Sequence, residues 1–231
     1  MSKEDQIQEL LANFVKNASV IIGKLSAERM IEESAINPIL AKALGFKDFD
    51  SLARFYVYQR IGRSLVTSFG MKMENLVKLA VDGEKGDWWD VVKKSDRVNY
   101  YVSVKSGPRD MNKDQTVEFS RRAKKVMSED SKAHPLIGMG YGKIVWPVIT
   151  ATLKKQGLDP KRHTYVGKRL YELLTGDNDF YKKLLDFVVN VESEVIKGKT
   201  ILELIDDKVD EISKGFKKKY KTIDDLLLDT F

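Results

Sequence analysis

The chain of 231 residues contains no cysteine and only two histidines, His134 and His163. Without cysteine, disulfides and thiolate metal sites are excluded, and two scattered histidines are too few for a zinc site. No apolar run reaches membrane-spanning length, and the N-terminus lacks the apolar core of a signal peptide. We therefore expect a soluble cytoplasmic protein with no membrane partner.

Hydrophobic spacing divides the chain into a helical first third and a mixed remainder. Residues 1–80 show helical periodicity, with Ser26, Asn37 and Asp50 as helix caps and separate helices over 51–67 and 71–81. We expect residues 1–80 to form a helical N-terminal annex. Residues 81–231 are expected to form the core with its C-terminal helices, in one compact unit with the annex.

The most informative stretch runs from residue 90 to residue 118. An apolar run after Asp90 and a β-branched, aromatic run ending at Lys105 predict a β-hairpin. Ser106-Gly107-Pro108 ends the pairing. Asn112, with Gln115 three residues later, predicts the start of a helix that carries Glu118 in its first turns.

Antiparallel pairing would bring Asp90 close to the end of the strand that carries Lys105, and the following helix can place Glu118 over the same point. Two carboxylates and a lysine at one strand edge suit metal-dependent phosphodiester cleavage. Carboxylates bind hard divalent cations, and a bound cation lowers the pKa of its water. Asp87 competes with Asp90 as the first metal ligand.

These residues resemble the PD-(D/E)XK nuclease superfamily, and among its members the type II restriction endonucleases. The usual acid two residues before the lysine is replaced here by Ser103, for which the resemblance implies a contact with the metal through water. One branch of restriction enzymes carries that acid on the following helix, where Glu118 stands. Lys105-Ser106-Gly107-Pro108 and the later block Gly167–Asp177 resemble enzymes that cut short G/C-rich palindromes, and the resemblance covers about residues 80–185.

The resemblance implies a restriction-endonuclease-like α/β fold, in which helices flank a mixed central sheet of four or five strands. It implies a homodimer that hydrolyses double-stranded DNA using Mg²⁺, with Asp90 and Glu118 as ligands and Lys105 acting on the attacking water. The DNA-reading candidates follow the lysine: Arg109, Asp110, Asn112, Lys113 and Gln115. Arginine can read guanine and aspartate can accept from cytosine. The related pattern continues with a second arginine where this chain has Met111.

Charge is concentrated around the proposed site. The whole chain carries a net charge of +6, and residues 91–128 alone hold ten basic and four acidic side chains. This excess is what a polyanionic partner requires; a solvated basic helix is the alternative.

The rest of the core supplies further strands and helices. Leu136–Ile149 is expected to be a strand with glycines that allow close backbone approach, including an apolar strand at Trp146–Ile149. Its GxGxG pattern lacks a helix start, so no nucleotide cofactor is expected. A short strand at His163–Val166, a helix closed by Gly176, and helices over 180–195 and from 201 onward complete the chain.

Two alternatives remain open from the sequence. One is a structure-directed or repair nuclease of the same superfamily. The other is a non-catalytic DNA-binding protein, because Ser103 replaces the usual acid.

Overall fold

The computed structural model describes residues 1–192 and 198–231. These residues divide into two compact units. The first unit consists of Met1–Leu11 and Phe69–Val191, and the second consists of Ala12–Ser68 and Glu192–Phe231. The division of the chain into a helical region 1–80 and a core 81–231 stays a prediction.

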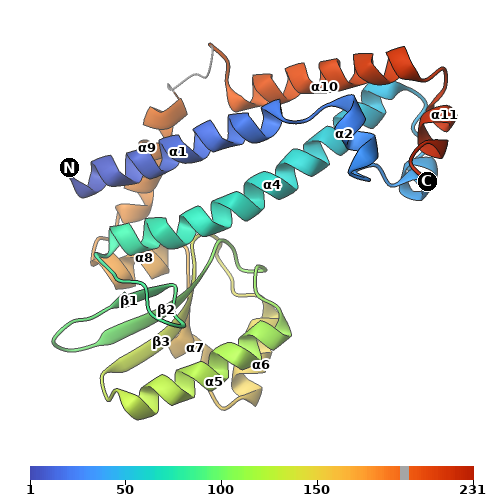
Figure 1. Ribbon diagram of the computed structural model, residues 1–231. Helices are drawn as coiled ribbons and strands as arrows, with labels where there is room; N and C mark the ends of the chain where they lie inside the picture. Colours follow the sequence, from blue (N-terminus) through green and yellow to red (C-terminus); the bar gives the residue numbers. More distant parts are fainter. Residues whose placement is uncertain (193–197) are drawn as a thin grey trace. The chain divides into compact units, whose positions relative to one another are not determined.

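The N-terminal third is helical, as the sequence predicts. It forms α1 (Lys3–Gly23), α2 (Ala27–Glu32), α3 (Pro38–Leu44) and α4 (Phe49–Ala80) (Figure 1). Ser26 and Asn37 cap α2 and α3.

Two details of the helical prediction are wrong. Asp50 lies inside the first turn of α4, and Asp48 Oδ1 instead accepts the Ser51 N–H at 2.8 Å. The two helices expected over 51–67 and 71–81 are one, because Gly70 between them costs a helix only about 1 kcal/mol and no proline interrupts it.

The first unit contains a four-stranded mixed sheet in the order β1-β2-β3-β4. The strands are β1 (Val91–Lys93), β2 (Asn99–Lys105), β3 (Ala133–Met139) and β4 (Thr164–Val166). β1 and β2 form the predicted antiparallel hairpin. β2, β3 and β4 are parallel, so the helices between them act as crossovers.

One face of this sheet is covered by α5 (Lys113–Glu129) and α6 (Pro147–Lys155), which are visible beside the strands in Figure 1. Phe119 and Ala123 from α5 and Leu153 from α6 pack there against Ile137 and Met139 of β3. This core fixes α5 over the hairpin end, and so fixes where its polar side chains lie.

The other face of β3 depends on close approach at two glycines. A Cβ on Gly138 would lie 2.8 Å from the Leu170 side chain, and one on Gly140 would lie 2.7 Å from Met73 Sδ. The expected role of these glycines is therefore confirmed. The strand expected to reach Ile149 is shorter, however, because Pro147 begins α6 and Trp146 is its N-cap rather than part of a strand.

The remaining elements of the first unit are α7 (Pro160–His163), α8 (Lys168–Thr175) and α9 (Phe180–Glu192). His163 ends α7 instead of beginning β4, and its buried Nδ1 donates to Pro135 O at 2.7 Å. Gly176 closes α8 as predicted, with a φ of 73°. The last part of the helix predicted over 180–195, including Val195, lies outside the described residues.

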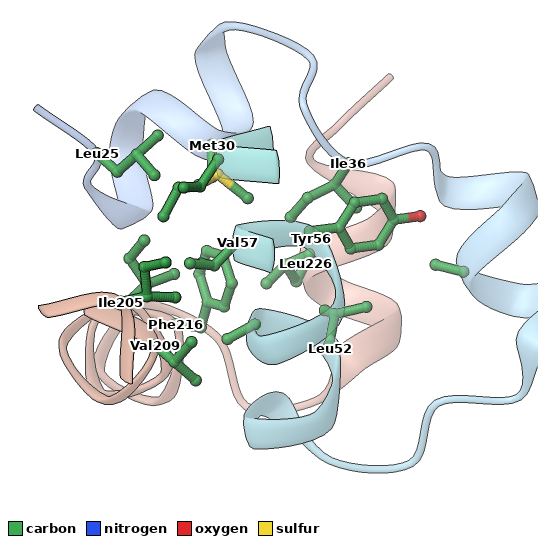
Figure 2. Packing of buried hydrophobic residues seen from close by; sticks show 14 of the residues in the cluster. Leu25, Met30, Ile36, Leu52, Tyr56, Val57, Ile205, Val209, Phe216 and Leu226 are labelled. Atoms are coloured by element: carbon green, nitrogen blue, oxygen red, sulfur yellow. The ribbon is translucent and has the colours of Figure 1, made fainter. Parts of the chain in front are cut away.

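The second unit has a core of its own. Figure 2 shows side chains of α4, of α10 (Ile201–Lys219) and of α11 (Ile223–Leu228) meeting there. Tyr56 is buried and donates its hydroxyl to Asn37 O at 2.8 Å. At the basic end of α10, Phe216 and Tyr220 are buried, while Lys217 pairs with Asp50 at 2.7 Å. Those aromatics are therefore core residues.

None of the helices in residues 1–192 and 198–231 is long and apolar enough to cross a membrane.

Candidate active site

The hairpin register places Asp90 at the end of β2. Val91 pairs with Val102, so Asp90 lies across from Ser103. The Val104 N–H donates to Asp90 Oδ2 at 2.7 Å. Lys105 Nζ lies 3.9 Å from the same oxygen and donates to Val104 O at 2.9 Å. The acid and the lysine are therefore neighbours across the hairpin.

Glu118 reaches this place from α5. The helix begins with the predicted capping box, in which Asn112 Oδ1 accepts the Gln115 N–H and Gln115 Oε1 accepts the Asn112 N–H, both at 2.9 Å. The Phe119 side chain, one residue after Glu118, is buried against the sheet. Glu118 itself is half-buried at the edge of that contact.

Two arginines hold the Glu118 carboxylate. Arg121 donates from Nε and Nη2 at 2.9 and 2.7 Å, and Arg122 donates from Nε at 2.7 Å. These hydrogen bonds, first from Arg121 and then from Arg122, lower the pKa of Glu118 to about 2. The carboxylate is therefore ionised at neutral pH.

Asp90, Ser103, Lys105 and Glu118 line a single cavity of about 230 Å³. Its other walls come from neighbours of these residues: Trp88, Trp89, Met111, Gln115, Phe119 and Arg122. The cavity thus brings together the four side chains expected to act in catalysis. Asp87, the competing acid, is exposed and does not line it.

Two consecutive tryptophans join the hairpin to α5. Trp89 is buried and meets Phe119 edge-on, with ring centroids 5.8 Å apart. Trp88 is 67% exposed, and the guanidinium of Arg122 lies 4.6 Å from its ring centroid. Together these contacts fix the position of the helix that carries Glu118 relative to Asp90. Trp89 is therefore a core residue, and Trp88 flanks the strand.

A further carboxylate, Glu74 on α4, interacts with this group and was missed from the sequence. Burial raises the pKa of Glu74 and the charge of Asp90 raises it further, while Lys105 and Lys85 lower it. The only signal in the sequence was its place among the apolar residues Met73, Leu76 and Val77, which the structure buries. The helical periodicity of these residues does not show that this part of α4 lies near the hairpin.

The DNA-reading candidates lie on the loop between β2 and α5 and on the first turn of α5. Arg109 and Lys113 are exposed. Asp110 accepts the Gly107 N–H at 2.6 Å, which shapes the loop. Asn112 and Gln115 are exposed but engaged in the capping box, and Gln115 also lines the cavity. Met111 is buried in the α5 core.

The cavity is lined by oxygen-bearing side chains of the types that bind hard cations. Asp90 and Glu118 supply carboxylate oxygens to the cavity, and Ser103 supplies a hydroxyl. Over the described part of the chain, no three His, Asp or Glu side chains are grouped closely enough to hold a metal ion.

A mixed sheet flanked by helices, with a helical N-terminal region, is consistent with a restriction-endonuclease-like fold. The family model described as type II restriction endonuclease EcoO109I matches residues 2–195. The match covers most of the chain, so the chain belongs to this family of DNA endonucleases. A comparison with curated proteins gave no match.

Proposed function

We propose that this protein cuts both strands of a short, G/C-rich palindromic DNA site in a Mg²⁺-dependent reaction, through a PD-(D/E)XK site with a displaced acid. The observation that carries the proposal is the single cavity lined by Asp90, Ser103, Lys105 and Glu118. The family match favours restriction over a repair nuclease or a non-catalytic DNA-binding protein.

Asp90 and Glu118 would hold the metal, with Ser103 contacting it through water. When bound, the cation would neutralise the scissile phosphate and lower the pKa of a water molecule. Asp90 is suited to this role because the Val104 N–H orients its carboxylate. Lys105 would orient the attacking water or stabilise the developing negative charge; the position of its ammonium beside Asp90 supports this role.

Glu74 is an acid near this site that does not line the cavity. Its raised pKa reflects burial first and then the charge of Asp90, which Lys105 and Lys85 partly offset. A divalent cation held by Asp90 would weaken that repulsion. We therefore assign Glu74 a supporting role beside the proposed metal ligands Asp90 and Glu118.

Sequence reading is assigned to the loop after Lys105 and the start of α5. Arg109 and Lys113 are exposed and basic, as groove and phosphate contacts require. Asp110, Asn112 and Gln115 would read bases with the polar atoms that the turn and the capping box leave available. A palindrome has two-fold symmetry, so a two-fold homodimer would place one site on each strand.

The test is digestion of plasmid DNA of known sequence with Mg²⁺, and with EDTA as the control. Discrete, mappable fragments are expected, and they should disappear with EDTA. Junction-dependent nicking would favour a repair nuclease, and an absence of Mg²⁺-dependent cutting would leave only DNA binding. Asp90→Ala should abolish cutting and Asp87→Ala should spare it; the reverse result would assign the metal to Asp87.

A further inference from the structure

The segment Tyr141–Ile144 leaves the sheet beside β2, the strand that ends at Lys105. β3 ends at Met139, but its pairing with β2 continues. Gly140 N–H donates to Lys105 O at 2.9 Å, and Tyr141 N–H donates to Ser106 O at 3.1 Å. The segment therefore starts at the carboxyl ends of the parallel strands, the edge where α/β sheets bind ligands.

Glycines let this segment pack directly on the loop that follows Lys105. A Cβ on Gly107 would lie 2.5 Å from Cζ and Oη of Tyr141, so the tyrosine ring covers that glycine. A Cβ on Gly142 would lie 3.0 Å from Pro108 Cγ, and its φ of +115° favours glycine as well. The segment and the proposed reading loop therefore form one surface.

The side chains presented on this surface are suited to a nucleic acid. Lys143 is exposed, Tyr141 is 59% exposed and Ile144 is 77% exposed. Single exposed apolar residues are common. Ile144, however, is next to the exposed Lys143 and three residues after Tyr141, whose ring covers Gly107. Isoleucine cannot hydrogen-bond a phosphate, so on duplex DNA it can contact only thymine methyls, base faces or sugars.

We propose that Tyr141–Ile144 is a second DNA-contacting element, in which Lys143 contacts a phosphate and Ile144 contacts the bases of the duplex. The proposal rests on the proposed function, because it takes duplex DNA as the occupant. Tyr141 couples this element to the reading loop through Gly107. A loop of this kind would add to the sequence reading done by residues 109–115.

Replacing Lys143 and replacing Ile144 should change DNA affinity in different ways. We would measure affinity for a short duplex carrying the mapped cleavage site and for a scrambled duplex, over a range of salt, with Asp90→Asn present to prevent cutting. Lys143→Ala should weaken both duplexes and lower the salt slope by about 0.9. Ile144→Ala should weaken only the cleavage-site duplex, by about 10-fold, because the shortened side chain no longer removes apolar surface of the bases from water, and should leave the salt slope unchanged.

Matched controls separate contact from general surface effects. Lys132 is exposed next to the opposite end of β3, and Leu185 is 66% exposed on α9. Lys132→Ala and Leu185→Ala should leave both affinities and the slope at wild-type values. If Lys143→Ala and Ile144→Ala behave like these controls, the proposal is wrong even though the protein cuts DNA.

The coupling through the glycine has its own test. In Gly107→Ala the new methyl group would displace the Tyr141 ring, so discrimination between the two duplexes should fall. Tyr141→Ala should reduce it as well, and the double variant should lose no more than the larger single loss, because both changes break the same contact. Additive losses in a folded double variant would overturn the coupling. Should the wild-type protein cut no DNA, the proposed function fails, and the Lys143→Ala salt slope on an uncut plasmid fragment still decides the inference.

Discussion

The Asp90 carboxylate accepts a hydrogen bond from the main-chain N–H of Val104, with 2.7 Å between Oδ2 and the nitrogen. One side chain therefore joins the two strands of the hairpin and also supplies an acid to the cavity. These structural and chemical roles can be separated, because an asparagine oxygen can accept the same hydrogen bond without carrying a charge.

Asp90→Asn should abolish cleavage while unfolding at nearly the wild-type denaturant midpoint. Asp90→Ala should also abolish cleavage, but should lose about 1–3 kcal/mol of unfolding free energy, since the N–H of the buried Val104 loses its partner. The measurements are plasmid cleavage and urea denaturation. An Asp90→Asn protein that cuts at the wild-type rate would remove Asp90 from the mechanism.

Glu74→Gln should raise stability and lower activity together. The pKa of Glu74 is raised in the folded state above its unfolded value near 4.5. Ionising Glu74 therefore costs more free energy in the folded protein than in the unfolded chain. That cost is absent below pH 4.5 and grows as pH rises through the folded pKa. Glutamine avoids it, so the variant should be more stable than wild type at pH 8, with an advantage that shrinks on acidification.

Cleavage by Glu74→Gln should fall because Asp90 and Lys105 lose a neighbouring carboxylate. Thermal unfolding across pH and plasmid cleavage are the two readouts. A variant that gains stability at pH 8 and cuts normally would show that Glu74 is only a strained neighbour of Asp90.

The capping box of α5 is expected to matter for catalysis as well as stability. Asn112→Ala should lose about 1 kcal/mol and should reduce cleavage, because α5 carries Glu118. The matched control is Thr200→Ala, which removes the capping box of α10 in the second unit. That variant should lose a similar free energy without losing cleavage; equal losses of cleavage would assign the effect to general destabilisation.

The hairpin and the α5 cap were predictable because each depends on neighbours in the sequence, whereas the alternate glycines of 138–142 indicated close approach without indicating that Leu170 and Met73 make it. Asp90 directly precedes β1, β2 follows β1 after a short turn, and Asn112 caps its own helix. Glu74 was not predictable, because it interacts with Asp90 through tertiary packing of α4. The break expected near Gly70 failed because helical propagation outweighed one glycine.

Arg122 and Trp88 are expected to position Glu118 rather than to touch substrate. Trp88→Ala removes the ring beneath the guanidinium of Arg122, so Glu118 should bind metal more weakly. Cleavage should then need more Mg²⁺ while its maximal rate changes less, and Trp88→Phe should rescue much of the loss. A Mg²⁺ requirement unchanged in Trp88→Ala would contradict the positioning role.

The displaced acid gives the last prediction. Ser103 lies across from Asp90 and lines the same cavity as Glu118. Glu118→Ala should be inactive, and adding Ser103→Glu should restore part of the Mg²⁺-dependent cleavage, because a carboxylate again lies beside Asp90 and Lys105.

Rescue is expected to be partial, since catalytic groups must be held within about 0.5 Å of the productive geometry. Ser103→Glu in the wild-type background is the control, and it should retain a measurable part of the activity if the cavity accommodates the added side chain. Wild-type cleavage by Glu118→Ala alone would show that the pair formed with Arg121 and Arg122 is a surface feature of α5. An inactive single variant without rescue would instead keep Glu118 in the site and show that only the helix position supplies the required geometry.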